Sequence, residues 1–233
     1  MCPMSLRVAL IVPCFNAGPY IAELTARAAT CLSREDMFCV NDGSTDGTRK
    51  AIEEAGVRLL DHDANRGKGQ ALQTAFRAVV MAGYDGAVAM DADLQHLPEE
   101  IPRFLELAQG FDVIVGARNY DLHNMPLDRW LTNKVTSHVV SALAGTPISD
   151  SQSGFRYLSR AAMDRVTLAT ANYDMESEQL IRAGRMGMRI GEVPITTVYS
   201  GEASYIKPWR DTVRFVRMAL RNITWKPEPN RAE

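Results

Sequence analysis

Apolar and polar residues follow one another in blocks whose period changes in a regular order along the first half of the chain. Short apolar runs with the length of β-strands occupy residues 6–15, 37–40, 57–61, 86–90 and 112–116. Between them, apolar residues recur at three- and four-residue steps, which indicates helices over residues 20–32, 45–55, 70–82 and 98–109. This alternation predicts an α/β fold built on a doubly wound, mostly parallel sheet.

After Arg118 the pattern becomes mainly helical. We expect helices at 129–143, 175–186 and 209–225, two short strands at 189–193 and 195–199, and a turn-rich segment at 145–158. The second half therefore resembles a lid laid over the first. We expect a single catalytic domain over residues 1–200, with a donor half at about 6–118 and an acceptor half at about 119–200. A C-terminal amphipathic helix and tail are expected over 201–233.

Composition excludes several classes of protein. The chain has 233 residues, of which 46% are hydrophobic and 23% charged, as expected for a globular domain with a sizeable core. The formal net charge of −2 provides no basic field for nucleic acid. The four cysteines form no C-x-x-C motif, and Cys14 and Cys39 lie in apolar runs, which favours reduced thiols over a disulfide framework or a zinc site. The first residues show neither a membrane span nor a signal-peptide pattern, so we expect a cytoplasmic protein.

Two aspartates one residue apart, Asp91 and Asp93, follow the apolar run at 86–90. Carboxylates at this spacing can reach one hard cation, Mg²⁺ or Mn²⁺, which also holds substrate phosphates. Gln95 projects to the same side if the chain stays extended. The alternative is that the aspartates only cap the helix that begins near Pro98.

Two other strand ends carry polar groups that could bind a nucleotide. Asp42, in VNDGSTDGT, can accept hydrogen bonds from a ribose or a base, although a turn with a helix cap is an adequate alternative. The NRGKG loop offers backbone amides with Arg66 and Lys68 to a diphosphate, but on its own it is more typical of a solvated loop. In parallel sheets such loops converge on one edge.

Taken in order, several segments resemble the family 2 glycosyltransferases of the glycosyltransferase-A fold, and most closely the dolichyl- and polyprenyl-phosphate hexose synthases. The segments are IVPCFNAGPYI, VNDGSTDGT, NRGKGQAL, MDADLQHLPEEIP, VGARN, SDSQSGFRYLSR and RIGEVPITTVYS, and they span about residues 6–200. The resemblance implies a nucleotide-sugar donor, a divalent cation (Mg²⁺ or Mn²⁺) and a polyprenyl phosphate acceptor. It also implies inversion at the sugar carbon.

The resemblance assigns roles on the donor side. Pro13, Phe15 and Asn16 match a segment on the nucleotide base, Asp42 matches an acidic position on base or ribose, and Asn65 and Lys68 match a loop near the nucleotide. Asp91 is expected near the ribose and the metal. Asp93 and Gln95 are the implied metal ligands. Many relatives have an aspartate pair where this chain has Asn41-Asp42, and an acid where it has Ala17, so the preferred base stays open.

The acceptor side carries cations and further acids. Arg118, Arg129, Lys134 and Arg156 are candidate clamps for a lipid phosphate, because a guanidinium fits phosphate at two points, and Ser153 with Gly154 could present backbone amides. Arg129 and Lys134 are equally typical of a solvated helix face. Asp150 and Glu178 match positions at the donor sugar and acceptor, so with Asp91 and Asp93 they complete the expected catalytic set.

Three functional hypotheses remain at this point. The first is an inverting hexosyltransferase that uses polyprenyl phosphate, which is already anionic and needs little help from a base. The second keeps the donor but transfers to a glycan hydroxyl, with Asp150 or Glu178 as general base. The third is a catalytically silent nucleotide-sugar-binding subunit, against which the Asp91, Asp93 and Gln95 set argues.

The last helix raises the question of a membrane surface. Trp209, Val213, Val216, Leu220 and Ile223 form an apolar stripe beside a second stripe of Arg210, Arg214, Arg217 and Arg221. Such a helix is typical of the membrane interface, which predicts peripheral attachment at the inner face of the membrane. The alternative is that the apolar stripe packs on the catalytic domain.

Overall fold

The computed structural model describes residues 6–118, 127–166, 174–198 and 208–227. Its strands are β1 (Val8–Cys14), β2 (Met37–Asp42), β3 (Arg58–His62), β4 (Gly86–Ala89), β5 (Val113–Arg118), β6 (Arg156–Ser159) and β7 (Ile190–Ile195). Its α-helices are α1 (Gly18–Ala28), α2 (Thr48–Ala55), α3 (Lys68–Met81), α4 (Ile101–Leu107), α5 (Leu127–Ala144), α6 (Arg160–Arg165), α7 (Met175–Arg185) and α8 (Pro208–Thr224). Short 3₁₀ turns occupy Arg34–Asp36 and Pro98–Glu100.

The seven strands form one sheet in the order β3-β2-β1-β4-β6-β5-β7. All neighbouring pairs are parallel except those of β6, which runs antiparallel to both β4 and β5. The predicted mostly parallel, doubly wound sheet is therefore confirmed. Strands from both halves of the chain lie in it, because β6 and β7 come from beyond residue 118.

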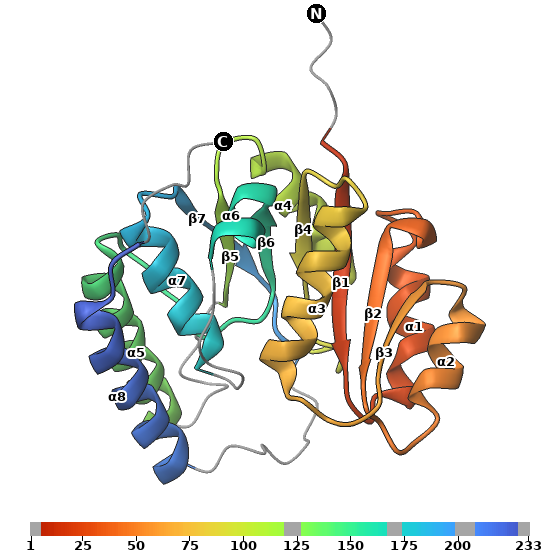
Figure 1. Cartoon of the computed structure of the whole chain (residues 1–233), viewed down its shortest axis with the longest axis horizontal. Coiled ribbons are helices and arrows are strands. Elements are labelled where there is room, and N and C mark those ends of the chain that lie inside the picture. Colours follow the sequence, from red (N-terminus) through yellow and green to blue (C-terminus); the bar gives the residue numbers. More distant parts are fainter. Residues whose placement is uncertain (1–5, 119–126, 167–173, 199–207, 228–233) are drawn as a thin grey trace, which may run out of the picture.

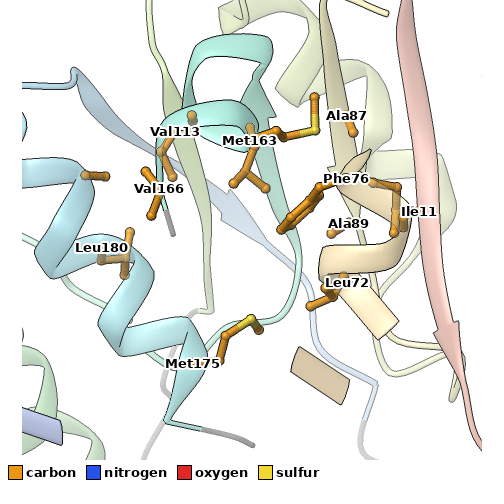
Figure 2. Close-up of a cluster of buried hydrophobic side chains, with 14 of the residues drawn as sticks. Ile11, Leu72, Phe76, Ala87, Ala89, Val113, Met163, Val166, Met175 and Leu180 are labelled. Atoms are coloured by element: carbon orange, nitrogen blue, oxygen red, sulfur yellow. The ribbon is translucent and has the colours of Figure 1, made fainter. Parts of the chain in front are cut away.

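Helices cover both faces of this sheet (Figure 1). The core on one face is built with α3, α6 and α7, and the core on the other with α1, α2 and α4. Figure 2 shows Phe76 of α3 and Met163 of α6 lying over the strands in the first of these cores. Burial from both sides explains why β1, with the sequence VALIVPC, is almost entirely apolar. Helices α5 and α8 lie side by side beyond α7, at one end of the sheet (Figure 1).

The second half differs from the prediction in two places. The segment expected to be turn-rich ends in a strand, β6, and the helix α6 follows it directly. This four-residue strand is too short to show a period, and its partners Ala89 and Val115 are distant in sequence. Of the two strands predicted around Pro194, β7 covers the first and continues through Pro194 to Ile195, where the second was expected to begin. Proline is tolerated there because β7 is an edge strand, so its missing N–H leaves no neighbour unpaired.

The strand directions determine where the functional loops meet. The carboxyl ends of β1, β2, β4 and β5 lie at one edge of the sheet, and β6 begins at that edge because it runs the opposite way. Its first residue, Arg156, pairs with Ala89 at the end of β4 and with Val115 of β5. The D-x-D segment (Asp91–Asp93) and the SQSG loop (Ser151–Gly154) are therefore adjacent, although about 60 residues separate them along the chain.

Candidate active site

A three-membered ionic chain lies at this edge of the sheet. The ammonium of Lys68, the first residue of α3, contacts Asp91 Oδ1 at 2.6 Å and Glu176 Oε1 at 2.8 Å. Burial acts to lower the pKa of Lys68, but the two carboxylates outweigh it, and the net shift is upward. Burial likewise acts to raise the pKa of Asp91, but the charge of Lys68 reverses the shift and holds it below the ordinary value. Both groups are therefore ionised at neutral pH.

Gly154 of the SQSG loop packs directly against this chain. A Cβ atom on Gly154 would lie 2.6 Å from Asp91 Oδ2 and 3.0 Å from Lys68 Nζ, well inside ordinary contact. Only a glycine allows the loop to approach so closely. The loop from the acceptor half thus closes over the D-x-D carboxylate.

Asp93 lies in a tight turn beside Asp91. Its Oδ1 accepts a hydrogen bond of 3.0 Å from the backbone N–H of Gln95, and the intervening Leu94 has a positive φ of 59°. Burial and the neighbouring charge of Asp91 raise the pKa of Asp93. Two carboxylates that repel one another in a partly buried turn suit a divalent cation, which would relieve that repulsion.

These residues fit an open cation site rather than a closed cage. Among the described residues, no group of three or more histidine, cysteine, aspartate or glutamate side chains is placed to hold a metal. Asp91 and Asp93 supply only carboxylate oxygens, and Gln95 beside them could add an amide oxygen. Such a set leaves coordination positions for substrate phosphate and water, as Mg²⁺ and Mn²⁺ sites usually do.

His96 is a packing residue of the same turn. Its ring lies 5.4 Å from that of Phe155, and it is 4% exposed. Burial lowers its pKa to about 4, so the imidazole is neutral at pH 7. Its Nδ1 has no partner among the described residues.

Arg118 at the end of β5 is paired with Asp150. Its Nε and Nη2 donate to the two carboxylate oxygens at 2.6 and 2.9 Å, and its backbone N–H donates to Oδ2 at 3.2 Å. Asp150 is 1% exposed. The two residues form one bidentate unit, so a phosphate would meet Arg118 together with its carboxylate.

The structure gives Arg156 a different setting from the expected phosphate clamp. It is 2% exposed and donates to the backbone carbonyls of Ser153 and Glu176 at 2.6 Å and of Ser151 at 2.7 Å. Its Nη1 also donates to Gln179 at 3.3 Å. Burial lowers its pKa to about 10, so it remains charged at neutral pH. Arg156 therefore ties the SQSG loop to the start of α7, and its geometry disfavours a direct contact with phosphate.

Glu178 likewise faces away from the ionic chain. It is fully buried and pairs with Arg182 at 2.8 Å and with Arg221 of α8 at 3.1 Å. This hub joins α7 to α8, so the geometry disfavours Glu178 as a catalytic acid or base. The carboxylate of α7 that contacts Lys68 belongs to Glu176, two residues before Glu178.

Three further acceptor candidates have different settings. Lys134 is exposed on α5, and the side chain of Arg129 on the same helix lies outside the described residues. Ser153 is buried next to Gly154, and its hydroxyl has no partner within the described part of the chain. Ser153 adjoins the ionic chain through its neighbour Gly154.

On the donor side, the structure brings the expected nucleotide segments to the same edge. Phe15 follows β1 with 51% of its surface exposed, and Pro13 is half-buried. Asn16 has a positive φ of 51°, and its side-chain oxygen accepts from the backbone N–H of Thr45 at 2.9 Å. The exposed ring of Phe15 is therefore free to contact a base, whereas Asn16 links the loops after β1 and β2.

Asp42 organises the NRGKG loop. Its carboxylate accepts from the backbone N–H groups of Arg66 and Gly67 at 2.9 and 2.8 Å, and it contacts His62 Nδ1 at 2.7 Å. Asn65 accepts from Gly67 at 3.1 Å. These bonds set the start of α3, and with it the position of Lys68.

Two residues that make contacts in this site, Glu176 and His62, were absent from the site predicted from the sequence. Glu176 lies in YDMESEQL, where three acids alternate, and the sequence offers no signal for which of them faces the sheet. His62 bridges Asp42 and Thr74, and a lone histidine at a strand end gives no indication of such a contact. Both assignments depend on packing between segments that are distant in sequence.

Comparison with known proteins identifies the family. A model described as Glycosyl transferase family 2 matches residues 9–167. The chain belongs to glycosyltransferase family 2. This confirms the predicted family and the prediction that the protein is an enzyme, a glycosyltransferase.

Two relatives at 30% identity have a lipid phosphate in their names. The undecaprenyl-phosphate mannosyltransferase of Micrococcus luteus is 30% identical over 204 residues, which cover 83% of this chain and 84% of that protein. The UDP-N-acetylglucosamine–dolichyl-phosphate N-acetylglucosaminyltransferase of Methanococcus voltae is 30% identical over 215 residues, covering 82% and 85%. Their sugars differ, but both names contain a polyprenol-type lipid phosphate.

A solved structure confirms the glycosyltransferase-A fold. Glucosyl-3-phosphoglycerate synthase from Mycobacterium tuberculosis, in complex with Mn²⁺, UDP-glucose and phosphoglyceric acid, matches 96% of this chain and 81% of its own, with a TM-score of 0.75. The sequences are 17% identical, so this likeness concerns the fold alone.

Proposed function

We propose that this glycosyltransferase moves a hexose from a nucleoside-diphosphate sugar to polyprenyl phosphate, with inversion at the sugar carbon. The observation that carries the proposal is that the candidate general bases are already ion-paired: Asp150 with Arg118, Glu178 with Arg182 and Arg221, and Glu176 with Lys68. A carboxylate held by a cation is a poor proton acceptor. A lipid phosphate already carries a negative charge, so as an acceptor it needs no such base. The names of both relatives support this choice over a glycan hydroxyl.

On the donor side, Lys68 binds the diphosphate at the start of α3, and Phe15 with Pro13 contacts the base. Asp91, Asp93 and Gln95 hold Mg²⁺ or Mn²⁺, a role supported by the open carboxylate pair and by the Mn²⁺ in the Mycobacterium tuberculosis complex. When bound, the cation supplies neutralisation of the charge that grows on the leaving diphosphate. Asp42 holds the loop that carries Lys68.

On the acceptor side, Arg118 and the Ser153–Gly154 loop approach the phosphate. Arg118 has a partly exposed side chain at the end of β5, and Asp150 fixes the direction of its guanidinium. The hydroxyl of Ser153 supplies a further donor. Arg156 acts indirectly by holding this loop. We propose that residues 1–200 act as one catalytic domain, which the shared sheet supports.

The lipid acceptor also requires contact with a membrane surface. Helix α8 packs through Met218 and Asn222, whereas Val216, Leu220 and Ile223 of the predicted stripe are about half exposed. About half of the surface of these three side chains is therefore available for contact with lipid. Trp209 and Arg210 have side chains outside the described residues. Among the helices that the structure describes, none has both the length and the apolar character to cross a bilayer.

Helix α5, which packs beside α8, carries exposed apolar residues too. Leu131 and Val135 on that helix are also about half exposed, and Lys134 lies between them in sequence. Apolar side chains bordered by basic groups are typical of a surface that lies on anionic lipid. We therefore propose peripheral attachment through α5 and α8.

The function is tested by incubating the purified protein with UDP- and GDP-linked hexoses, Mn²⁺ and undecaprenyl phosphate, with mass spectrometry of the lipid. We expect a mass gain of one hexose that depends on the cation. Transfer to a soluble glycan without transfer to lipid phosphate would refute the proposed acceptor.

Attachment is tested by co-sedimentation with vesicles that contain anionic lipid at low salt. We expect the wild type to sediment with vesicles, and the double variant Leu220→Gln, Ile223→Gln to remain in the supernatant. Met81 on α3 is 87% exposed and lies outside α5 and α8, so Met81→Gln is a matched control that should sediment like the wild type. Equal recovery of the wild type and the double variant in the supernatant would refute a membrane role for α8.

A further inference from the structure

The Asp91 carboxylate has a close neighbour at each of its oxygens. Lys68 Nζ lies 2.6 Å from Oδ1, and the main chain of Gly154 packs so close to Oδ2 that a Cβ there would lie 2.6 Å away. A divalent cation cannot share this carboxylate with an adjacent ammonium without strong repulsion. Lys68 in its present place therefore opposes the binding of a cation through Asp91.

Lys68 has a second carboxylate partner, Glu176, with which it can stay paired when it leaves Asp91. Glu176 Oε1 contacts the ammonium at 2.8 Å, while Glu176 Oε2 is buried and has no partner among the described residues. An unpaired buried carboxylate oxygen is costly and suggests a group that arrives with the substrate. Because Lys68 is held by two acids, it can leave Asp91 and still keep one counter-ion.

The position of Lys68 in the chain favours a diphosphate as its next partner. It is the first residue of α3, a helix of 14 residues whose positive end faces the site. The preceding loop is fixed by the Asp42 hydrogen bonds to Arg66 and Gly67. The backbone there stays in place while the long lysine side chain turns toward an anion at the helix end.

We propose that Lys68 competes with the cation for Asp91. In the free enzyme its ammonium is paired with Asp91. When the cation binds, the ammonium leaves Asp91, contacts the donor diphosphate and stays paired with Glu176. This inference rests on the proposed function, since it takes a divalent cation and a nucleoside diphosphate as ligands. Its consequence is that cation and nucleotide bind cooperatively, because each removes the obstacle to the other.

The experiment measures Mn²⁺ alone, and then UDP and GDP in the presence of Mn²⁺, by calorimetry. In Lys68→Met we expect Mn²⁺ alone to bind about tenfold more tightly, because a positive charge next to its ligand is gone. The nucleotide is expected to bind about tenfold more weakly, since its phosphate loses a charged donor. The control is Lys50→Met, which removes the same charge from an exposed lysine paired with Glu54, and which should match the wild type in both titrations.

A structure of the wild type soaked with Mn²⁺ and the nucleotide provides a readout that needs no variant. We expect Lys68 Nζ to lie beyond 4 Å from Asp91 Oδ1 while it stays within hydrogen-bond distance of Glu176. Lys68 still paired with Asp91 in that complex, or Mn²⁺ affinity unchanged or reduced in Lys68→Met, would overturn the proposal. These results are independent of the lipid: failure of lipid transfer with normal Mn²⁺ and nucleotide binding would refute the acceptor and not the exchange.

Discussion

The close approach of Gly154 to the ionic chain makes a sharp prediction about its replacement by alanine. The added Cβ would lie 2.6 Å from Asp91 Oδ2, whereas ordinary contact begins at 3.4 Å, so the loop and the carboxylate must separate by about 0.8 Å. The same atom would lie 3.0 Å from Lys68 Nζ. The φ of Gly154 is not in the left-handed region, so alanine adds a steric contact without backbone strain.

The expected effect is on turnover rather than on folding. Misplacement of a reacting group by about 1 Å can lower a rate about 100-fold, which corresponds to about 2.7 kcal/mol of transition-state stabilisation. We therefore expect Gly154→Ala to lower kcat/KM for hexose transfer by one to two orders of magnitude, with only a small change in the unfolding midpoint. The assay is initial-rate transfer to undecaprenyl phosphate at saturating Mn²⁺, alongside thermal unfolding.

Gly47→Ala is the matched control. Gly47 lies at the start of α2, and a Cβ there would meet nothing within 4 Å. This variant should transfer hexose like the wild type. The reasoning is refuted if Gly154→Ala keeps wild-type kcat/KM, or if Gly47→Ala loses as much activity as Gly154→Ala.

Three further predictions follow from buried charges. Arg156→Lys removes a guanidinium that serves three backbone carbonyls, and we expect a loss of about 3 kcal/mol in the free energy of unfolding by urea titration, with unchanged urea stability as the contrary result. Glu178→Gln leaves Arg182 and Arg221 without their shared carboxylate, and we expect the free energy of unfolding to fall by a similar amount, about 3 kcal/mol. A lower kcat with unchanged stability would instead indicate that Glu178 acts in catalysis. Because the pKa of Asp93 is raised in the folded protein, its charge is disfavoured at neutral pH, so Asp93→Asn should slightly raise the melting temperature while Mn²⁺ binding is lost. That gain in melting temperature should shrink as pH falls through the pKa of Asp93, because the protonated aspartic acid of the wild type is then neutral like the asparagine. A gain that grows at low pH would contradict an upward shift of the Asp93 pKa.

Local sequence was enough to predict the donor half. The strands and helices before residue 118 follow from apolar periodicity, since each of these elements buries a continuous face against the sheet. Strand ends in a parallel sheet share one edge, so the positions of Asp42, Lys68, Asp91 and Asp93 near one another could be expected without any coordinates.

The partners of the charged residues were decided only by tertiary structure. Arg156 and Glu178 were sensible site candidates by residue type, yet packing directs one onto backbone carbonyls and the other onto α8. Glu176 lies next to Lys68 because β6 runs antiparallel in the sheet and brings the SQSG loop and α7 to the edge where Asp91 lies. This four-residue strand is too short to give a periodic signal in the sequence. Residue type and spacing determine which groups are charged, whereas the contacts between distant segments determine which charges meet, because the energy of an ion pair depends on a few ångströms of separation and on burial.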